Sequence, residues 1–364
     1  MLKILGFGGA LVLSVCATNL NDSESIGLSS ELSKPTNIEP SSNKNNSTDQ
    51  GSSDQSQSLE TDTLSPTEPP SEVPLTLEEE LAIIQTPIDI DPLSEDAWTS
   101  LPIIPAGISD RMLKLFKMGK KMGRDPRQFA VVGDCHSSPV FFLKNFDDPP
   151  PNPRYNLGKQ YQYLQETIDY YKGSFNTGVG ARNGQNVTSV LSAFWADPER
   201  CEPSEGPLAC ELRIKNPAFA FISLEKNWWG TKEEYTTYLE TIINYTIGEG
   251  IIPILGTKAH NLEGEHFINH AVVEVARRYE IPLWNFWASV QDVPRGGLEE
   301  DLEHLSLNLK TYYDFSDPQN FDNGWALRNL TGLMILDFMR KSLINEIGLG
   351  HQMVFMLERW IVNS

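Results

Sequence analysis

Cysteine and basic residues are scarce in this chain of 364 residues. Its four cysteines are too few for a disulfide-dense scaffold or a cysteine-rich zinc module. Its 29 Lys and Arg residues are outnumbered by 49 Asp and Glu residues, which gives a net charge of −20. Because nucleic-acid binding requires a basic surface that neutralises phosphates, this balance argues against nucleic acid as a partner.

Long apolar runs are also missing, and the run nearest the N-terminus is short. Residues 4–15 are too few for a transmembrane helix, so residues 1–16 are predicted to be a signal peptide. The segment ends in LSVC, which resembles a bacterial lipobox with Cys16 as the lipidated residue, although Val15 stands where that motif prefers Gly, Ala or Ser. An ordinary signal-peptidase site before Ala17 is the alternative. Both readings predict an exported protein, either a cell-envelope lipoprotein or a secreted protein, with membrane contact only through a lipid anchor.

A long polar segment follows the signal peptide. Residues 17–80 contain 13 acidic and 2 basic residues and show no apolar periodicity. Such a segment has too little apolar surface to repay the entropy lost on ordering. We therefore predict that residues 17–85 form a disordered acidic tether, which would hold a folded domain at 86–364 away from a membrane or wall. An acidic interaction tail is the alternative.

The remaining residues alternate short apolar runs with amphipathic stretches. This alternation predicts an α/β fold with a five-stranded parallel sheet and with sites at the carboxyl ends of the strands. The expected strands are residues 129–133, 173–176, 218–224, 251–256 and 282–286, of which 173–176 has the weakest pattern. The expected helices lie near residues 157–171, 185–195, 232–249, 265–279 and 325–345.

The first expected strand runs into Gly133-Asp134-Cys135-His136. A tight turn from strand to helix would place Cys135 where backbone N–H groups and the helix dipole lower the pKa of a thiol. The sequence therefore predicts a nucleophilic cysteine at this turn. A buried structural cysteine is the other interpretation, because free cysteines are usually buried.

Two more polar motifs occur later in the chain. Asn227 follows the strand expected at 218–224, where its amide could serve as an oxyanion donor, although Asn in such a place is usually a turn former. Asp301 and His304 are three residues apart, a spacing that lets a carboxylate bind the Nδ1 atom of an imidazole, as in acyl-transfer sites. An acidic surface patch is the alternative, because Glu residues flank this pair.

The order of these motifs resembles that of the SGNH hydrolases, also called GDSL esterases and lipases. The resemblance covers about residues 125–345. It implies a three-layer α/β/α domain of flavodoxin-like type that acts, without metal or cofactor, on esters of lipids, sugars or peptidoglycan. On the matching positions it implies a nucleophile at Cys135, a dyad of Asp301 and His304, and an oxyanion hole from the backbone of Cys135, Gly184 and Asn227, with Gly180 as the alternative to Gly184.

The sequence departs from this family at two motifs. Cys135 stands where the family has Ser, and Leu-Glu-Lys-Asn ending at Asn227 replaces the usual Gly-x-Asn-Asp. A cysteine nucleophile forms a thioester, which partitions differently from a serine ester. If the turn were shifted by two residues, Ser137 would be the nucleophile instead.

These observations lead to two functional hypotheses. The first is hydrolysis or transfer of an acyl group from an extracellular or envelope ester, such as an acylated carbohydrate. The second is a catalytically inactive domain that binds glycan or envelope components on a wall formed by Trp228 and Trp229. Asp134, Trp228 and His260 are expected to contact the ligand, although a loop histidine without a ligand contact is the default interpretation of His260. The sequence leaves the oligomeric state open.

Two residue pairs outside these motifs also have chemical potential. Cys201 and Cys210 flank a loop that contains Pro and Gly, so a disulfide between them is expected in an exported protein. His266 and His270 are four apart on an expected helix, which is a spacing that can bind metal. No Glu accompanies them as in a zincin, so a solvated helix face is the favoured reading and no metal site is predicted.

Overall fold

The computed structural model describes residues 75–94, 96–151, 153–175, 178–226 and 228–362, with backbone alone for 344–362. The predicted signal peptide at 1–16, its Cys16 and most of the predicted tether lie outside the described residues. So does Asn227. Among the helices of the described part, none is both long and apolar enough to cross a membrane.

Within the described residues, four parallel strands form the sheet, in the spatial order β1-β2-β3-β4. Val131 of the first strand lies opposite Phe221 of the second, and Ile222 lies opposite Leu255 of the third. This arrangement confirms the predicted α/β fold with a parallel sheet. The strands are β1 (Asp125–Gly133), β2 (Pro217–Ser223), β3 (Ile252–Gly256) and β4 (Leu283–Trp284).

A fifth strand was predicted at residues 173–176. Its described residues, 173–175, do not form a strand, so the prediction is wrong there. Residues 173–175 form a turn and bend, and Gly173 has a φ of 88°. The Ser174 hydroxyl accepts the backbone N–H of Phe129 and donates to its carbonyl, so a side chain replaces the ladder that a strand would provide. A single parallel bridge between Gly133 and Ala181 lies on this side of β1.

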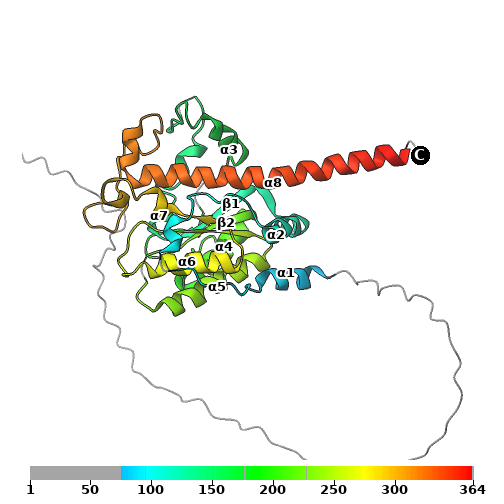
Figure 1. The fold of residues 1–364 in the computed structure, drawn as a ribbon, viewed down its shortest axis with the longest axis horizontal. Coiled ribbons are helices and arrows are strands. Elements are labelled where there is room, and N and C mark those ends of the chain that lie inside the picture. Colours follow the sequence, from blue (N-terminus) through cyan, green and yellow to red (C-terminus); the bar gives the residue numbers. More distant parts are fainter. Residues whose placement is uncertain (1–74, 95, 152, 176–177, 227, 363–364) are drawn as a thin grey trace, which may run out of the picture. The chain divides into compact units, whose positions relative to one another are not determined.

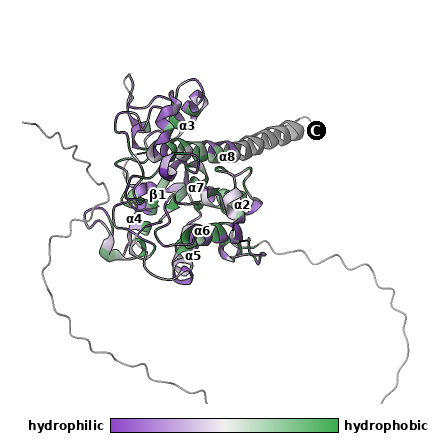
Figure 2. Ribbon diagram, turned by 60° about the vertical axis from the view of Figure 1, so that its left-hand side comes forward, coloured by the Kyte–Doolittle hydropathy of each residue, from purple (hydrophilic) through white to green (hydrophobic). Residues whose placement is uncertain are grey.

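Helices cover both faces of the sheet. Figure 1 shows α8 on one side of β1 and β2, and α5 and α6 on the other. Figure 2 shows hydrophobic and hydrophilic residues mixed along α2 and α6, as expected for helices with one buried face. The described α-helices are α1 (Leu77–Gln85), α2 (Asp110–Lys121), α3 (Gln165–Tyr170), α4 (Pro207–Lys215), α5 (Lys232–Gly248), α6 (Phe267–Arg278), α7 (Phe286–Ser289) and α8 (Gly324–Val362).

Short 3₁₀ segments replace parts of two expected helices. The stretch expected at 185–195 contains only two 3₁₀ turns, because the Asn186 side chain accepts the N–H groups of Thr188 and Ser189 and competes with a regular helix. The stretch expected at 157–171 is helical only near its end. The 3₁₀ segments are η1 (Ala97–Ser100), η2 (Cys135–Ser137), η3 (Lys144–Asp147), η4 (Gln162–Leu164), η5 (Ser189–Leu191), η6 (Ala193–Trp195), η7 (Pro294–Gly297) and η8 (Pro318–Asp322).

The folded domain begins earlier than the predicted boundary at residue 86. Helix α1 starts with a capping box, in which Thr76 and Glu79 bond each other's backbone N–H groups. Its Ile84 is buried in the core, whereas the neighbouring Ile83 is exposed. The predicted tether therefore cannot extend to residue 85. The composition of the preceding polar segment hid this short amphipathic helix.

The loop before α4 contains the expected disulfide. Cys201 and Cys210 are bonded, with their Cα atoms 5.3 Å apart. The second cysteine lies in α4, so the bond ties the loop to this helix.

Candidate functional site

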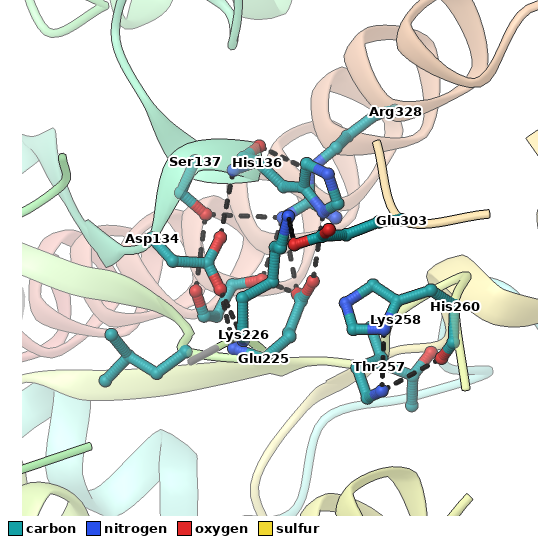
Figure 3. Close-up of polar contacts among 12 residues, drawn as sticks. Asp134, His136, Ser137, Glu225, Lys226, Thr257, Lys258, His260, Glu303 and Arg328 are labelled. Atoms are coloured by element: carbon teal, nitrogen blue, oxygen red, sulfur yellow. Dashed lines mark hydrogen bonds and ion pairs between the residues drawn. The ribbon is translucent and has the colours of Figure 1, made fainter. Parts of the chain in front are cut away.

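The carboxyl ends of the strands meet the loop that carries Asp301 and His304. Figure 3 shows residues from the turn after β1, the loop after β2 and the loop after β3 gathered beside Glu303 and Arg328. Gly133 is the last residue of β1, and only glycine fits there without a steric clash. A Cβ atom there would lie 2.4 Å from the Ser137 side chain and 2.7 Å from the Ser223 carbonyl oxygen.

Asp134 holds two of these loops together. One carboxylate oxygen accepts the backbone N–H of His136 at 2.9 Å, and the other accepts those of Glu225 and Lys226 at 2.8 Å each. Burial raises the pKa of this carboxyl group, and the nearby Glu225 raises it further. Asp134 is fully buried and both its oxygens are engaged, so these contacts do not support the predicted contact of Asp134 with a ligand. Its role is to position the loops.

Asp301 and His304 form the contact expected from their spacing. Asp301 Oδ2 lies 2.5 Å from Nδ1 of His304, and Asp301 Oδ1 accepts the His304 backbone N–H. Desolvation opposes ionisation of Asp301, but the hydrogen bonds from His304 outweigh it and lower the pKa of this carboxyl group to about 2. The carboxylate thus orients the imidazole and leaves Nε2 on the far side of the ring. That Nε2 atom is buried and has no hydrogen-bond partner among the described residues.

Three imidazole rings lie close together at this point. The centroid of the His136 ring is 6.4 Å from that of His304 and 6.0 Å from that of His260. Burial lowers the pKa of His136 and of His260, so both rings are held neutral. Sequence analysis singled out His260 but missed His136, whose one signal was its place directly after the Asp-Cys turn.

Cys135 lies at the start of η2, as expected for the predicted nucleophile, but its sulfur is in a disulfide. A disulfide sulfur has no thiolate to attack an acyl carbon. The side chain is also almost fully buried. Cys135 in this form is therefore not the reactive thiol that the sequence predicted.

Ser137, the alternative nucleophile, is buried as well. Its Oγ is 3.5 Å from the Ser223 carbonyl oxygen and 3.3 Å from Nη2 of Arg328. These contacts hold it against β2 and α8, on the packed side of the turn. The structure gives no support to a turn shifted by two residues.

A buried arginine was not found from the sequence. Arg328 of α8 is fully buried, with Nε donating to the His136 carbonyl oxygen at 2.6 Å and Nη2 donating to Ser223 Oγ at 2.8 Å. The same nitrogen lies 3.3 Å from Glu225 Oε1. The guanidinium also stacks over Trp284, 4.8 Å from the ring centroid. Its only sequence signal was a single basic residue early in the expected helix 325–345.

The loop after β3 contains a second buried ion pair. Nζ of Lys258 contacts the Glu263 carboxylate, donates to the His260 carbonyl oxygen at 2.9 Å and lies 3.1 Å from Nδ1 of His260. Burial lowers the pKa of Lys258, while Glu263 opposes that shift. A third ion pair, with 2.6 Å between Lys226 Nζ and Glu303 Oε1, connects the loop after β2 to the Asp301–His304 loop.

These ion pairs lie beside a cleft of about 380 Å³. Trp229 at this cleft is 96% exposed, whereas the Trp228 indole is half-buried and donates to the Thr231 carbonyl oxygen. Two of the three predicted ligand contacts, Trp228 and His260, therefore border one cavity, whereas Asp134 does not line it. The residues that line it are Glu225, Lys226, Trp228, Trp229, Gly230, His260, Leu262, Glu263, Phe267, Ile268 and Glu303.

The two glycines expected as alternatives in the oxyanion hole differ in their contacts. The Gly180 N–H donates to the Glu211 carboxylate at 3.1 Å, so Gly180 is not available as the alternative donor. Gly184 has a φ of 82° and lies in a turn, where glycine is favoured. Asn227 lies outside the described residues.

Two groups of residues have side chains that could ligate a metal ion. Asp134, His136 and Glu225 have donor atoms within 4.8 Å of one another, but Asp134 already accepts three backbone N–H groups and Glu225 is paired with the Arg328 guanidinium. Glu225 Oε2 and both ring nitrogens of His136 have no hydrogen-bond partner among the described residues, so hydrogen bonds satisfy this cluster only in part.

His266 and His270, the second group, pack their rings against Trp98, each at 5.5 Å. His266 is half-buried, and burial lowers its pKa. The prediction of a solvated helix face is therefore wrong for His266, which belongs to an aromatic cluster.

Comparison of the chain with protein-family models and with curated proteins found no match.

Proposed function

We propose that the protein is an exported carboxylic ester hydrolase of the SGNH type, acting on an extracellular or envelope ester such as an acylated carbohydrate. The observation that carries this proposal is the Asp301–His304 pair. Its Nδ1 contact is 2.5 Å long, and its buried Nε2 has no partner among the described residues. An imidazole oriented in this way is the general base of acyl-transfer sites.

The finer fold assignment is part of the proposal. In a three-layer flavodoxin-like domain, one further strand pairs with the first strand along its other edge. That edge faces away from the strands that follow in the sheet. The parallel bridge between Gly133 and Ala181 lies on that side of β1 and supports this topology. The placement of helices on both faces of the sheet supports the three layers (Figure 1).

In the proposed mechanism, Cys135 acts as a thiol after an external thiol or phosphine reductant has supplied two electrons to its disulfide, with two protons taken up from water and the partner sulfur released as a second thiol. Nε2 of His304 takes the thiol proton, and the thiolate attacks the ester carbon. The alcohol leaves with the proton returned by His304, and a thioester to Cys135 remains. Water, activated by the same nitrogen, then hydrolyses the thioester and restores the thiol. The Asp301 carboxylate stabilises the imidazolium in both steps, and backbone N–H groups at Cys135 and Gly184, with Asn227, would bind the oxyanion.

The test is hydrolysis of p-nitrophenyl acetate by the full chain, before and after treatment with a phosphine reductant. We expect turnover only after reduction. His304→Ala should lower kcat/KM by roughly 10²-fold or more, because general-base catalysis contributes about that much. Cys135→Ala should abolish turnover and Cys135→Ser should retain some, whereas Ser137→Ala should leave it unchanged. A Cys201→Ser/Cys210→Ser variant controls for reduction of the other disulfide.

Two results would contradict this proposal. One is unchanged activity in His304→Ala, which would remove the dyad from the mechanism. The other is absence of turnover in both redox forms, while alkylation and mass spectrometry confirm that Cys135 has been reduced.

A second candidate function is favoured by the disulfide at Cys135. A site whose nucleophile position is oxidised can still bind a ligand, and the exposed Trp229 ring beside the cleft is suited to stacking. The domain would then bind glycan or envelope components without cleaving them. Saccharide binding without turnover in either redox form would support this function over the first.

A further inference from the structure

The neutral form of an imidazole has one N–H donor and one acceptor, and its surroundings decide which nitrogen carries the proton. In His260 this choice follows from the contacts of Lys258. The ammonium has three N–H donors and no acceptor. Its three contacts are the Glu263 carboxylate, the His260 carbonyl oxygen and Nδ1 of His260.

Two of these three groups are acceptors only, so the third N–H of Lys258 points to Nδ1. Nδ1 must then accept, and the proton of the neutral ring must sit on Nε2. Burial and the neighbouring Lys258 charge lower the pKa of His260, which keeps the ring neutral and prevents Nδ1 from gaining a proton. Lys258 therefore fixes His260 as a donor through Nε2.

That donor has no acceptor among the described residues. Nε2 of His260 is buried and without a hydrogen-bond partner among the described residues, and His260 borders the cleft. In Figure 3 the ring extends from the loop after β3 toward the side on which Glu303 and His136 lie. A buried, unpaired N–H group costs free energy, so a ligand that supplies an oxygen acceptor is favoured there.

The same cleft also offers an unpaired acceptor. Oε2 of Glu263 is used by Lys258, but its Oε1 is buried and has no hydrogen-bond partner among the described residues. A ligand that both donates and accepts within a short distance satisfies His260 and Glu263 together. Hydroxyl groups do so, since each has one donor and two acceptor lone pairs.

The charges around the cleft indicate an uncharged ligand. Each of its three carboxylates has a cationic partner: Glu225 with Arg328, Glu263 with Lys258, and Glu303 with Lys226. Among the described residues that line the cleft, these pairs leave no excess of either sign to attract an ionic group. The exposed ring of Trp229 adds an apolar face on which a sugar ring can stack.

We propose that this cleft is a neutral saccharide subsite, in which His260 donates from Nε2 to a sugar oxygen and Glu263 accepts from a hydroxyl. Lys258 is a positioning residue that sets the tautomer of His260. The inference rests on the proposed function in one respect. If the protein is an esterase, this subsite would bind the alcohol part of the ester. Binding itself requires no turnover.

The first experiment measures the tautomer directly. Long-range ¹H–¹⁵N NMR spectra of the full chain report the protonation of each imidazole nitrogen. We expect His260 to show a protonated Nε2 and an unprotonated Nδ1 between about pH 5 and pH 8, because burial lowers its pKa and keeps the ring neutral, and Lys258 occupies Nδ1. A protonated Nδ1, in a neutral or a charged ring, would overturn the assignment of Lys258 as the positioning residue.

The second experiment measures binding by calorimetry, with xylotetraose and chitotetraose as neutral probes and tetragalacturonate as the acidic comparison. We use the full chain in the His304→Ala background, so that ester chemistry plays no part. At least one neutral probe should bind, more tightly than tetragalacturonate. His260→Phe should weaken binding about tenfold or more. His260→Gln, whose amide N–H can take the place of Nε2–H, should stay within about threefold of the parent.

The outcomes separate this proposal from the proposed function. If neither neutral probe binds, or if His260→Phe binds as tightly as the parent, the subsite is wrong, whatever the esterase assay shows. Tighter binding of tetragalacturonate would also overturn it, because the argument requires an uncharged ligand. Absence of p-nitrophenyl acetate hydrolysis with normal saccharide binding would reject the esterase and retain the subsite. Circular dichroism of both His260 variants checks that they are folded.

Discussion

At the scale of single residues, the main feature of the site is the pairing of buried charges. Arg328 and Glu225 are both almost fully buried, and the guanidinium also bonds the turn after β1. Removal of one partner leaves the other charge desolvated and uncompensated, which is costly in a protein interior. The geometry of the turn therefore depends on a residue that is far from it in the chain.

Arg328→Met tests this dependence. We expect the free energy of unfolding to fall by about 3–5 kcal/mol, because Glu225 would be buried without a counter-charge. The matched control is Arg154→Met, since Arg154 also pairs with a carboxylate, that of Asp148, but is largely exposed. That change should cost less than about 1 kcal/mol. Urea unfolding of both variants gives the comparison, and equal losses would contradict the role of Arg328.

Asp301→Asn tests the low pKa of the dyad carboxylate. The pKa of Asp301 falls from 3.8 to about 2 on folding, so its ionised form stabilises the folded state. This contribution is fully present above pH 3.8 and is lost as the pH falls through 2. The wild type should therefore be more stable than Asp301→Asn near pH 5, with the difference shrinking toward pH 2. Denaturant titrations at several pH values measure it. A difference that is constant from pH 5 to pH 2 would mean that the carboxylate does not titrate as inferred.

At the scale of elements, α1 shows how a short helix can be hidden by its neighbours. Nine residues with three adjacent acids in the first turn resemble the polar segment before them. Only the contact with the core distinguishes this helix from that segment. The burial of Ile84 and the exposure of Ile83 make the two residues a natural pair for comparison.

Ile84→Ala should lower the free energy of unfolding by about 2–5 kcal/mol, as other truncations of buried aliphatic side chains do. Ile83→Ala, at the next position of the same helix, should change it by less than about 0.5 kcal/mol. Chemical unfolding of the two variants checks this. A small effect at both positions would mean that α1 does not pack on the domain in solution.

At the scale of the whole molecule, the polar segment and the folded domain differ in what they contribute to stability. Residues 17–74 contain 10 acidic and 2 basic residues and few large apolar ones, so they offer little surface for burial. Residues 75–343 supply the buried core. The boundary between the two parts is set by α1.

Two deletions measure where the domain begins. Removal of residues 17–74 should change Tm by no more than about 2 °C, because the segment has little apolar surface to bury. Removal of residues 17–85, which also takes away α1, should lower Tm clearly, since Ile84 belongs to the core. Calorimetry of the full chain and both deletions distinguishes the cases. A large loss on the shorter deletion would show that the polar segment packs on the fold.

Much of the fold could be predicted because its signals are local. The buried runs of β2 and β3 are short and apolar on both faces, and α5 and α6 have amphipathic patterns close to their observed bounds. The failures occurred where a distant group overrode the local pattern. Ser174 bonds Phe129, 45 positions earlier in the chain, and this contact replaces the expected fifth strand.

The sequence by itself determined the parallel α/β architecture, the disulfide loop and the proximity of Asp301 to His304, because strand burial, loop length and a spacing of three residues all act locally. Tertiary structure alone decided which charges are buried and how they are paired. Arg328 meets Glu225 across 103 positions, and Lys226 in the loop after β2 meets Glu303 in the Asp301–His304 loop. Desolvation and Coulomb attraction become strong only after the fold has brought the partners together and buried at least one of them, so no local sequence pattern indicates these pairs.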